Sequence, residues 1–362
     1  MTRLAFFGSS LLSAYWNGAA TYYRGLLQAL APLGWDITFC EPDAYDRQSH
    51  RDIDPPEWAR VVVYPATVDG VRAVLADAAR ADVMVKASGV GVFDTELLAG
   101  LMATAAVRVF WDVDAPATIA EMRAAFSHPL RRSLGGIDLV LTYGGGDPVV
   151  EAYTALGSRQ CVPIYNALDP AMHFPVVPDP DLAADLGFLA NRMPDREARA
   201  EAFFFAPAAA MPHKRFLLGG AGWDDKPLSA NIRRLGHVGT WRHNAFNCSC
   251  QAVLNVSRDS MASIGFSPAT RVFEAAGAAA CLITDAWEGI DLFLKPGAEV
   301  LVARDGQDVA DHLSELTPGR ARAIGAAGRE CVMAEHTYAR RARIVDRLLH
   351  EVLARAGEPR AA

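Results

Sequence analysis

The sequence predicts an α/β protein made of two doubly wound, mostly parallel sheets. Short apolar runs alternate with segments of helical period along most of the chain. The alternation stops at the proline-rich segment 167–181 and then starts again. The chain has 362 residues, of which 51% are hydrophobic. A chain of this length and apolar content is larger than a single hydrophobic core usually accommodates. We therefore expect domains at 1–166 and 182–335, a linker at 167–181, and a C-terminal helix at 336–362 that braces both domains.

In the first half, a buried strand, a loop rich in glycine and serine and an apolar-periodic helix follow one another up to Gly34. Further strands and helices repeat this order, which favours a parallel sheet with helices on both faces. The expected strands lie at 3–7, 35–40, 61–65, 82–88, 107–112, 137–144 and 161–167.

In the second half the same order returns. A helix is expected at 195–209, and the segment 245–256 is expected to contain a helix that runs into a strand. The remaining strands are expected at 185–191, 215–222, 233–239, 281–285 and 299–305. Ligands of such sheets bind at the carboxyl ends of the strands, so side chains placed there are the candidates for function.

Charge and cysteine content limit the class of protein. The net charge of −7 argues against a surface that neutralises nucleic acid. The six cysteines are scattered, and Cys248-Ser-Cys250 lacks a second pair at metal-ligand spacing. No apolar run approaches the roughly 20 residues of a membrane span. We expect a cytoplasmic protein with reduced thiols, no metal site and no membrane span.

The segment 263–285 reads as a loop, a helix start, a helix and a buried strand. Ser267 suits the N-cap and Pro268 the first helical position, so the amides of Ala269 and Thr270 would point at a bound anion. Arg271 in the first turn favours the same anion, for which a diphosphate is the obvious candidate. An ordinary capped helix with an internal ion pair is the alternative.

Three more arginines and one carboxylate extend this candidate site. Glu274, one turn after Arg271, would accept hydrogen bonds from ribose hydroxyls or pair with that arginine. Arg192 and Arg196 flank the turn after the first strand of the second domain, and Arg258 follows the strand at 254–256. A solvated helix start and an interdomain salt bridge are the alternatives.

Two aspartates end the strand at 107–112. Asp112 and Asp114 would act as a general base on an acceptor hydroxyl or orient it, and loop capping is the alternative. The first loop is a second candidate for the acceptor region. Tyr22 and Tyr23, in the helix after it, would offer aromatic faces to a sugar, and the equally plausible alternative is that they pack this helix on its sheet. The acceptor or cleft candidates are Gly8, Ser9, Ser10, Trp16, Asn17, Gly18 and Lys86.

Several segments resemble one family. NRMPDRE at 191–197, LNVSRD at 254–259, SPATRVFEAAGAA at 267–279, LITDAWEGID at 282–291, PGAEVLVARD at 296–305 and HTYARR at 336–341 are similar to CgeB-like glycosyltransferases. YNALDPAMHFP at 165–175 resembles the interdomain segment of the distantly related family 4 enzymes. The resemblance implies the GT-B architecture, in which two Rossmann-like domains face each other across a cleft.

The resemblance also implies roles for residues. Glu274 matches the family glutamate that holds the ribose, and Arg192 and Arg196 lie where relatives place basic groups near the diphosphate. Family 4 enzymes carry a second glutamate eight residues before the first, where this chain has Phe266. The contacts to the sugar therefore differ from the family pattern.

We predict an enzyme that moves a sugar from a UDP, GDP or dTDP sugar to a hydroxyl acceptor, whether glycan, protein or metabolite. The leaving diphosphate would be stabilised by a helix N-terminus and arginines, with no metal and no tightly bound cofactor. A sugar-nucleotide epimerase of the same fold and a non-catalytic nucleotide-sugar-binding protein are the alternatives. An NAD-linked oxidoreductase is disfavoured because no G-x-G-x-x-G follows the first strand.

Overall fold

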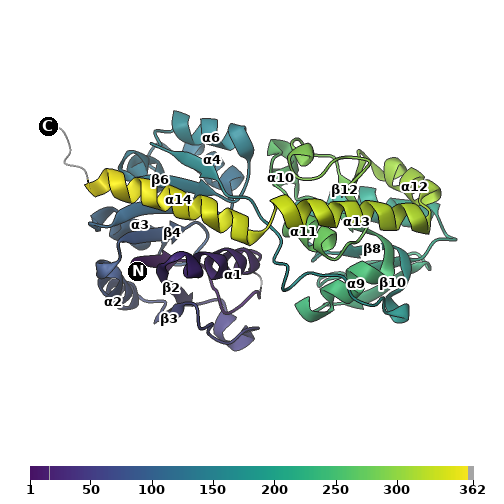
Figure 1. Cartoon of the computed structure of the whole chain (residues 1–362), viewed down its shortest axis with the longest axis horizontal. Helices are drawn as coiled ribbons and strands as arrows, with labels where there is room; N and C mark the ends of the chain where they lie inside the picture. The colour runs from purple at the N-terminus through teal and green to yellow at the C-terminus, as the bar shows by residue number, and fades with distance from the viewer. Residues whose placement is uncertain (16, 358–362) are drawn as a thin grey trace. The chain divides into compact units, whose positions relative to one another are not determined.

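The computed structural model describes residues 1–15 and 17–357, so the acceptor candidate Trp16 lies outside the described residues. The chain divides into two compact units. The first unit is Met1–Tyr165 together with the C-terminal segment from Tyr338, and the second is Asn166–Thr337. The segment expected as a linker thus belongs to the second unit, and the last helix belongs to the first (Figure 1).

The first unit contains a seven-stranded sheet in the order β3-β2-β1-β4-β5-β6-β7. Every neighbouring pair is parallel, as expected for strands joined by helical crossovers. The strands are β1 (Thr2–Phe7), β2 (Trp35–Asp43), β3 (Arg60–Pro65), β4 (Val83–Ala87), β5 (Val107–Asp112), β6 (Leu139–Thr142) and β7 (Cys161–Pro163).

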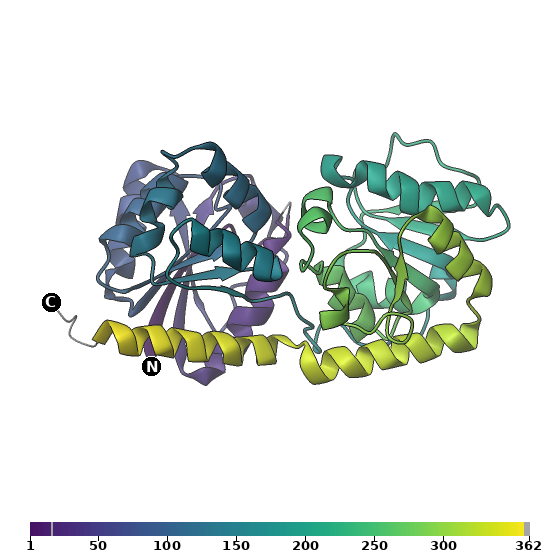
Figure 2. The same ribbon diagram turned by 90° about the horizontal axis from the view of Figure 1, so that it is seen from above.

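Helices cover both faces of this sheet (Figure 2). The last helix of the chain, α14, packs against the first, α1, and both also contribute to the buried apolar core. The helical segments are α1 (Ala19–Leu30), η1 (Ala31–Leu33), η2 (Arg47–His50), α2 (Val68–Asp77), η3 (Ala78–Arg80), α3 (Asp94–Ala103), α4 (Ala115–Ala124), α5 (Pro129–Ser133), η4 (Leu134–Gly136), α6 (Gly146–Ala155) and α14 (Tyr338–Gly357).

The second unit contains a six-stranded sheet in the order β10-β9-β8-β11-β12-β13, again parallel throughout. Its core is formed by alternate residues of the central strands and by the aromatic run at 203–205. The strands are β8 (Ala184–Leu189), β9 (Phe216–Gly219), β10 (Ile232–Gly236), β11 (Cys250–Asn255), β12 (Leu282–Asp285) and β13 (Leu301–Ala303).

The helix expected at 195–209 is interrupted by one π-helical segment, η6, which places three consecutive phenylalanines in the core. The helical segments of this unit are η5 (Pro180–Leu182), α7 (Pro194–Ala200), η6 (Glu201–Phe205), α8 (Ala206–Ala210), η7 (Thr240–Arg242), α9 (His243–Ser249), α10 (Asp259–Ile264), α11 (Thr270–Gly277), η8 (Ile290–Leu292), α12 (Gly306–Glu315) and α13 (Pro318–Glu335).

The start expected for the helix after residue 266 is wrong by two residues. The N-cap of α11 is Ala269, in an extended conformation, and no side chain caps the helix. Ser267 and Pro268 precede it, because the Pro268 carbonyl is held by the Asn166 side-chain amide at 3.0 Å rather than entering the helix. The first helical amides therefore belong to Thr270 and Arg271.

Each sheet reverses its strand order once. The reversal lies between β1 and β4 in the first unit and between β8 and β11 in the second. In open α/β sheets the loops that leave the carboxyl ends at this point form the ligand site. These loops begin at Gly8 and Ser88 in the first unit and at Ala190 and Val256 in the second.

Candidate functional site

The reversal point of the second unit brings basic side chains together. Arg196 lies in the first turn of α7, which follows β8, and Arg258 is the N-cap of α10, which follows β11. Arg271 lies in the first turn of α11. Burial lowers the pKa of Arg196; Asp195 and Asp285 oppose this shift, while the positive charges of Arg258 and Arg271 add to it. The three guanidinium groups therefore share one electrostatic environment.

Arg196 differs from its neighbours in having no carboxylate at ion-pair distance among the described residues. Its Nε is buried and has no hydrogen-bond partner within the described part of the chain. A buried donor without an acceptor costs free energy, about 1–3 kcal/mol for an ordinary group and more for a charged one. An anion at this position would satisfy it.

Two other arginines at the reversal point are already paired. Arg258 Nε donates to Asp195 Oδ2 at 2.7 Å. Arg199, on α7, donates from Nη2 to Asp285 Oδ2 at 2.5 Å, and the fully buried Asp285 also accepts the Ser257 amide. These pairs tie the loops after β8, β11 and β12 to one another.

Arg192 does not join this group as the sequence suggested. Its guanidinium lies 2.5 Å from Glu197 and 2.8 Å from Asp225. Two carboxylates thus offset the charge of Arg192, whereas one is paired with Arg258.

Glu274 lies at the centre of a second cluster on the same helix. Its side chain is 12% exposed, and Oε2 lies 3.1 Å from Arg271 Nη1. His173 Nε2 lies 3.7 Å from Oε1, and His243 Nδ1 lies 3.9 Å from Oε2. Burial would raise the pKa of Glu274, but Arg271, His173 and His243 together lower it. The carboxylate is therefore ionised near neutral pH.

Three separate segments place these side chains. Asn244, next to His243 on α9, donates from Nδ2 to the Met172 carbonyl at 2.9 Å and accepts the Phe174 amide at 3.3 Å. That clamp fixes His173 between the two bonded residues. Helix α11 approaches the same segment closely, since a Cβ on Gly277 would lie 3.0 Å from the His173 carbonyl.

The other predicted diphosphate residues lie just before and at the start of α11. Ser267 is buried, and Ala269 and Thr270 are the N-cap and first residue of the helix. Phe266, which stands where the family has a glutamate, adopts a left-handed conformation with φ of 48°. Its amide donates to the Glu288 carbonyl.

In the first unit Asp112 is fully buried at the end of β5. Ser88 Oγ and Thr118 Oγ1 donate to its Oδ1 at 2.7 and 3.0 Å, and the Tyr153 hydroxyl donates to its Oδ2 at 2.5 Å. Burial raises its pKa, and these hydrogen bonds oppose that shift. The geometry supports a structural role for Asp112, because both oxygens are occupied and neither reaches solvent.

Asp114 is placed differently. It is half-buried and forms the N-cap of α4, and its amide donates to Asp112 Oδ1 at 3.0 Å. The buried aspartate thus positions the loop that carries the second aspartate.

The loop after β1 is held by a buried carboxylate that the sequence reading missed. Glu41, on β2, accepts the Ser10 hydroxyl at 3.0 Å and the Leu11 amide at 2.5 Å. Ser9 Oγ donates to Asn17 Oδ1 at 2.9 Å. The signal was present in the sequence, since a glutamate near the end of an apolar strand needs buried donors.

The remaining acceptor-side candidates flank this loop. Gly8 lies where a Cβ would meet the Phe39 ring at 2.5 Å, and Gly18 is the N-cap of α1. Lys86 is buried at the end of β4, and its Nζ lies 2.5 Å from Asp94 Oδ1. This ion pair neutralises Lys86 within the first unit.

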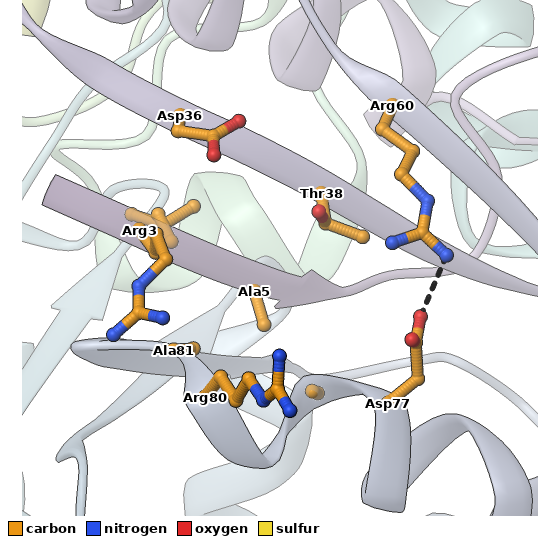
Figure 3. A pocket seen from close by; sticks show the side chains of 10 residues that line it. Arg3, Ala5, Asp36, Thr38, Arg60, Asp77, Arg80 and Ala81 are labelled. Atoms are coloured by element: carbon orange, nitrogen blue, oxygen red, sulfur yellow. Dashed lines mark hydrogen bonds and ion pairs between the residues drawn. The ribbon is translucent and has the colours of Figure 1, made fainter. Parts of the chain in front are cut away.

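A hollow of about 240 Å³ lies elsewhere in the first unit (Figure 3). Arg3, Asp36 and Arg60 lie at the amino-terminal ends of β1, β2 and β3. Asp112 lies at the carboxyl end of β5, so the hollow and Asp112 are at opposite ends of the strands. Arg60 pairs with Asp77 at 2.8 Å, and Arg3 pairs with Asp82 at 3.1 Å. Arg80 also lines the hollow, and we assign the hollow no role.

Among residues 1–15 and 17–357, no helix has the length and apolar character to cross a membrane. No group of three or more His, Cys, Asp or Glu side chains within these residues is arranged to hold a metal ion.

One family of known proteins is similar to part of this chain. Residues 196–346 match the model of a family described as glycosyl transferase-like. The matched part of the chain is similar to that family, and it contains Arg196, Arg258, Arg271 and Glu274. No curated protein matches the chain.

The solved structures show the fold of the whole chain. The sucrose-phosphate synthase of Thermosynechococcus elongatus has a TM-score of 0.73 at 16% identity, covering 98% of this chain and 100% of that one. HepE of Anabaena in complex with UDP and glucose has a TM-score of 0.67 at 13% identity, covering 97% and 100%. An alpha-glucosyltransferase in complex with UDP-glucose and DNA has 0.70 at 10%, covering 97% and 99%. The fold is that of GT-B glycosyltransferases, as predicted.

Proposed function

We propose that the protein transfers a sugar from a nucleoside diphosphate sugar to a hydroxyl acceptor. The observation that carries the proposal is Arg196, a half-buried guanidinium without a carboxylate partner among the described residues, grouped with Arg258 and Arg271 at the reversal point. Several GT-B structures of similar fold contain UDP or UDP-glucose. A diphosphate is an anion that suits guanidinium groups sharing one electrostatic environment.

The chemistry explains why cations belong there. When the glycosidic bond to the diphosphate breaks, positive charge develops on the sugar and negative charge on the leaving group. Preformed guanidinium groups aimed at the diphosphate stabilise that charge without reorganisation, and the Thr270 and Arg271 amides at the start of α11 add to it. This mechanism uses side chains of the protein and requires no metal ion.

Roles follow for the other residues. Glu274 accepts hydrogen bonds from the ribose, since a carboxylate suits a vicinal diol. Asp114 is the first-unit residue that we propose as base or orienting group for the acceptor hydroxyl, with Asp112 holding its loop. The acceptor loop comprises Gly8, Ser9, Ser10, Asn17 and Gly18.

The test is a panel of UDP, GDP, dTDP, CMP and NAD, in which a ligand that binds the native state raises the melting temperature. A selective rise with one nucleoside diphosphate, abolished in Arg196→Met, supports the proposal. Incubation with the matching UDP or GDP sugar and a set of hydroxyl acceptors should then release that diphosphate. Conversion of the donor sugar without release would favour an epimerase, and binding without any turnover a non-catalytic protein.

A further inference from the structure

The loop after β2 carries a buried arginine to which the proposed function gives no role. Arg47 is the first residue of η2, and only 9% of it is exposed. Its Nη1 donates to the Ser9 carbonyl at 3.1 Å. Its Nε is buried and has no hydrogen-bond partner in the part of the chain that the structure describes. Buried polar atoms in folded proteins are nearly always paired, so this donor needs an acceptor that a ligand would supply.

The charge of Arg47 also lacks a close partner. Burial lowers the pKa of its guanidinium, and the Glu41 carboxylate opposes that shift. Glu41 itself is occupied by neutral donors. Its Oε1 accepts the Ser10 hydroxyl at 3.0 Å and Gln48 Nε2 at 2.7 Å, and its Oε2 accepts the Leu11 amide at 2.5 Å. No carboxylate among the described residues lies at ion-pair distance from Arg47. A bound anion would supply both the missing acceptor and the missing charge.

Tyr45 holds the guanidinium of Arg47 in a fixed position. The guanidinium carbon lies 4.9 Å from the centre of the Tyr45 ring, within the range of a cation–π contact. The Tyr45 hydroxyl in turn donates to the Gly91 carbonyl at 2.6 Å. Tyr45 and Asp46 both adopt left-handed conformations, with φ of 58° and 56°, which are uncommon for residues other than glycine. Conformations of this kind cluster at ligand clamps, where the surrounding structure holds them. The guanidinium is therefore in place before a ligand binds.

Arg47 connects the loops at the strand reversal of the first sheet. The bonds just described reach Ser9 in the loop after β1 and Gly91 in the loop after β4. The reversal lies between these two strands, and ligands of open α/β sheets bind at such a point. Burial raises the pKa of Tyr23, Asp112 adds to that shift and Arg47 opposes it, so both charges lie near this phenol. The guanidinium therefore lies at the edge of the sheet that carries the loops proposed for the acceptor.

We propose that Arg47 binds a phosphate or carboxylate group of the acceptor, so that the protein transfers its sugar to an anionic acceptor. A guanidinium presents a planar set of N–H donors that matches the oxygens of either group. A neutral acceptor would leave the buried charge unpaired, and such a loss typically weakens binding by about tenfold or more. This inference rests on the proposed function, because it names the chemical class of the acceptor in that reaction.

The anionic group takes no part in the bonds that change. In the transfer, the bond from the anomeric carbon to the diphosphate oxygen breaks, and the diphosphate keeps the electron pair. The acceptor hydroxyl oxygen forms the new bond to that carbon, and its proton passes to a base, for which we propose Asp114. Arg47 holds and orients the acceptor, so its loss should raise KM for the acceptor more than it lowers kcat.

The first experiment measures anion binding in the absence of any donor. Sodium phosphate or sodium acetate is added to full-length Arg196→Met, in which the proposed diphosphate site has lost one arginine, and sodium chloride keeps the ionic strength constant. A ligand of the native state raises the melting temperature. We expect a rise with at least one of the two anions. A larger rise with phosphate identifies a phosphate-bearing acceptor, and a larger rise with acetate identifies a carboxylate. No rise with either anion would overturn the inference.

Matched variants locate this response. When Arg47→Met is added to Arg196→Met, the rise should disappear. When Arg51→Met is added instead, the rise should remain, because Arg51 is exposed and its guanidinium binds the Gln48 side chain. Arg47→Lys retains the charge without the planar fork, so it should reduce the rise, and it takes the place of Arg47→Met if that variant does not fold. An undiminished rise in either Arg47 variant would count against the inference.

The second experiment measures diphosphate release by the unaltered protein with matched acceptors. Glucose is compared with glucose 6-phosphate and glucuronic acid, and 4-hydroxybenzyl alcohol is compared with 4-hydroxybenzoate, since the members of each set differ by one anionic group. The anionic members should react about tenfold faster or more, and Arg47→Met should remove this preference. Equal or faster release with the neutral members would overturn the inference while leaving the proposed function intact. If no acceptor releases diphosphate, the proposed function fails, and the anion titration alone decides whether Arg47 is an anion site.

Discussion

Arg271 and Glu274, one turn apart on α11, form an ion pair of 3.1 Å between Nη1 and Oε2. The residue proposed to bind diphosphate thus neutralises the residue proposed to bind ribose. Both side chains are largely buried, with 16% of Arg271 and 12% of Glu274 exposed. Loss of either one would therefore leave the other as a buried charge without compensation. The proposed donor site would be pre-assembled by this pair, and each member would have a structural as well as a binding role.

Breaking this pair should cost stability. Arg271→Met leaves Glu274 buried with two histidines, and we expect a loss of about 1–3 kcal/mol in the free energy of unfolding. Adding Glu274→Gln should recover much of that loss, because the double variant contains no unpaired charge. Urea unfolding of the single and double variants measures the coupling.

The control for this cycle is the exposed pair Arg347–Glu351, in which the side chains are 68% and 51% exposed. Arg347→Met should change the free energy of unfolding little, since surface pairs contribute 0–1 kcal/mol. A cost for Arg271→Met no larger than that for Arg347→Met would contradict the structural role of the buried pair.

Arg196→Met should separate binding from folding. Its guanidinium has no carboxylate partner in the described structure and lies in the field of two other arginines, so its removal should not lower the melting temperature of the ligand-free protein. Nucleoside diphosphate affinity should fall by about 1–3 kcal/mol, the scale of a charge-assisted hydrogen bond. Titration calorimetry and thermal unfolding of the same preparation test both halves.

Arg304→Met is the matched control for Arg196→Met. It belongs to the same unit, is 81% exposed and pairs with Asp308. Arg304→Met should leave nucleotide affinity unchanged. Equal weakening in both variants would mean that general positive charge, and not the position of Arg196, attracts the nucleotide.

Tyr153→Phe should destabilise the first unit. The phenol donates to Asp112 Oδ2, and its loss leaves a fully buried carboxylate oxygen without that donor. We expect a loss of about 1–3 kcal/mol in the free energy of unfolding. Tyr64→Phe is the comparison, because the Tyr64 hydroxyl is buried and has no hydrogen-bond partner among the described residues. Removing that hydroxyl should be neutral or stabilising, and a similar loss in both variants would argue against the Asp112 network.

The buried histidine predicts a pH dependence of stability. His243 has a folded-state pKa of about 4 against 6.5 for an ordinary histidine, so between these values the unfolded chain binds more protons. Its contribution is fully present above pH 6.5 and is lost as the pH falls towards 4, by up to about 3 kcal/mol. Glu274, with its lowered pKa, acts in the same direction at still lower pH.

His243→Asn should therefore reduce the slope of unfolding free energy against pH between 6.5 and 4. Urea unfolding at several pH values measures that slope. The exposed His213, replaced in the same way, controls for the loss of an imidazole from the second unit. Identical slopes in the parent protein and in His243→Asn would show that this ring titrates normally.

The spacing of apolar residues was sufficient to predict the fold, because it indicates which residues are buried. The apolar runs of β1, β5, β8 and β11 and the intervening helical periods predicted the parallel sheets and the two-part division of the chain. The same pattern located Arg196, Arg258 and Arg271, since each follows a strand or begins a helix. The start of α11 was misplaced because Asn166, some hundred residues earlier, holds the Pro268 carbonyl, and no local rule includes that bond.

The sequence by itself thus determined the architecture, the position of the basic residues at the strand ends and the helix that carries Arg271 and Glu274. Only the tertiary structure decided which charges are already paired. It showed Arg192 bound by two carboxylates, Asp112 enclosed by three side-chain donors, and His173 and His243 beside Glu274. Periodicity depends on the burial of each residue in its own element, whereas pairing depends on distances between side chains from different elements, which only packing fixes.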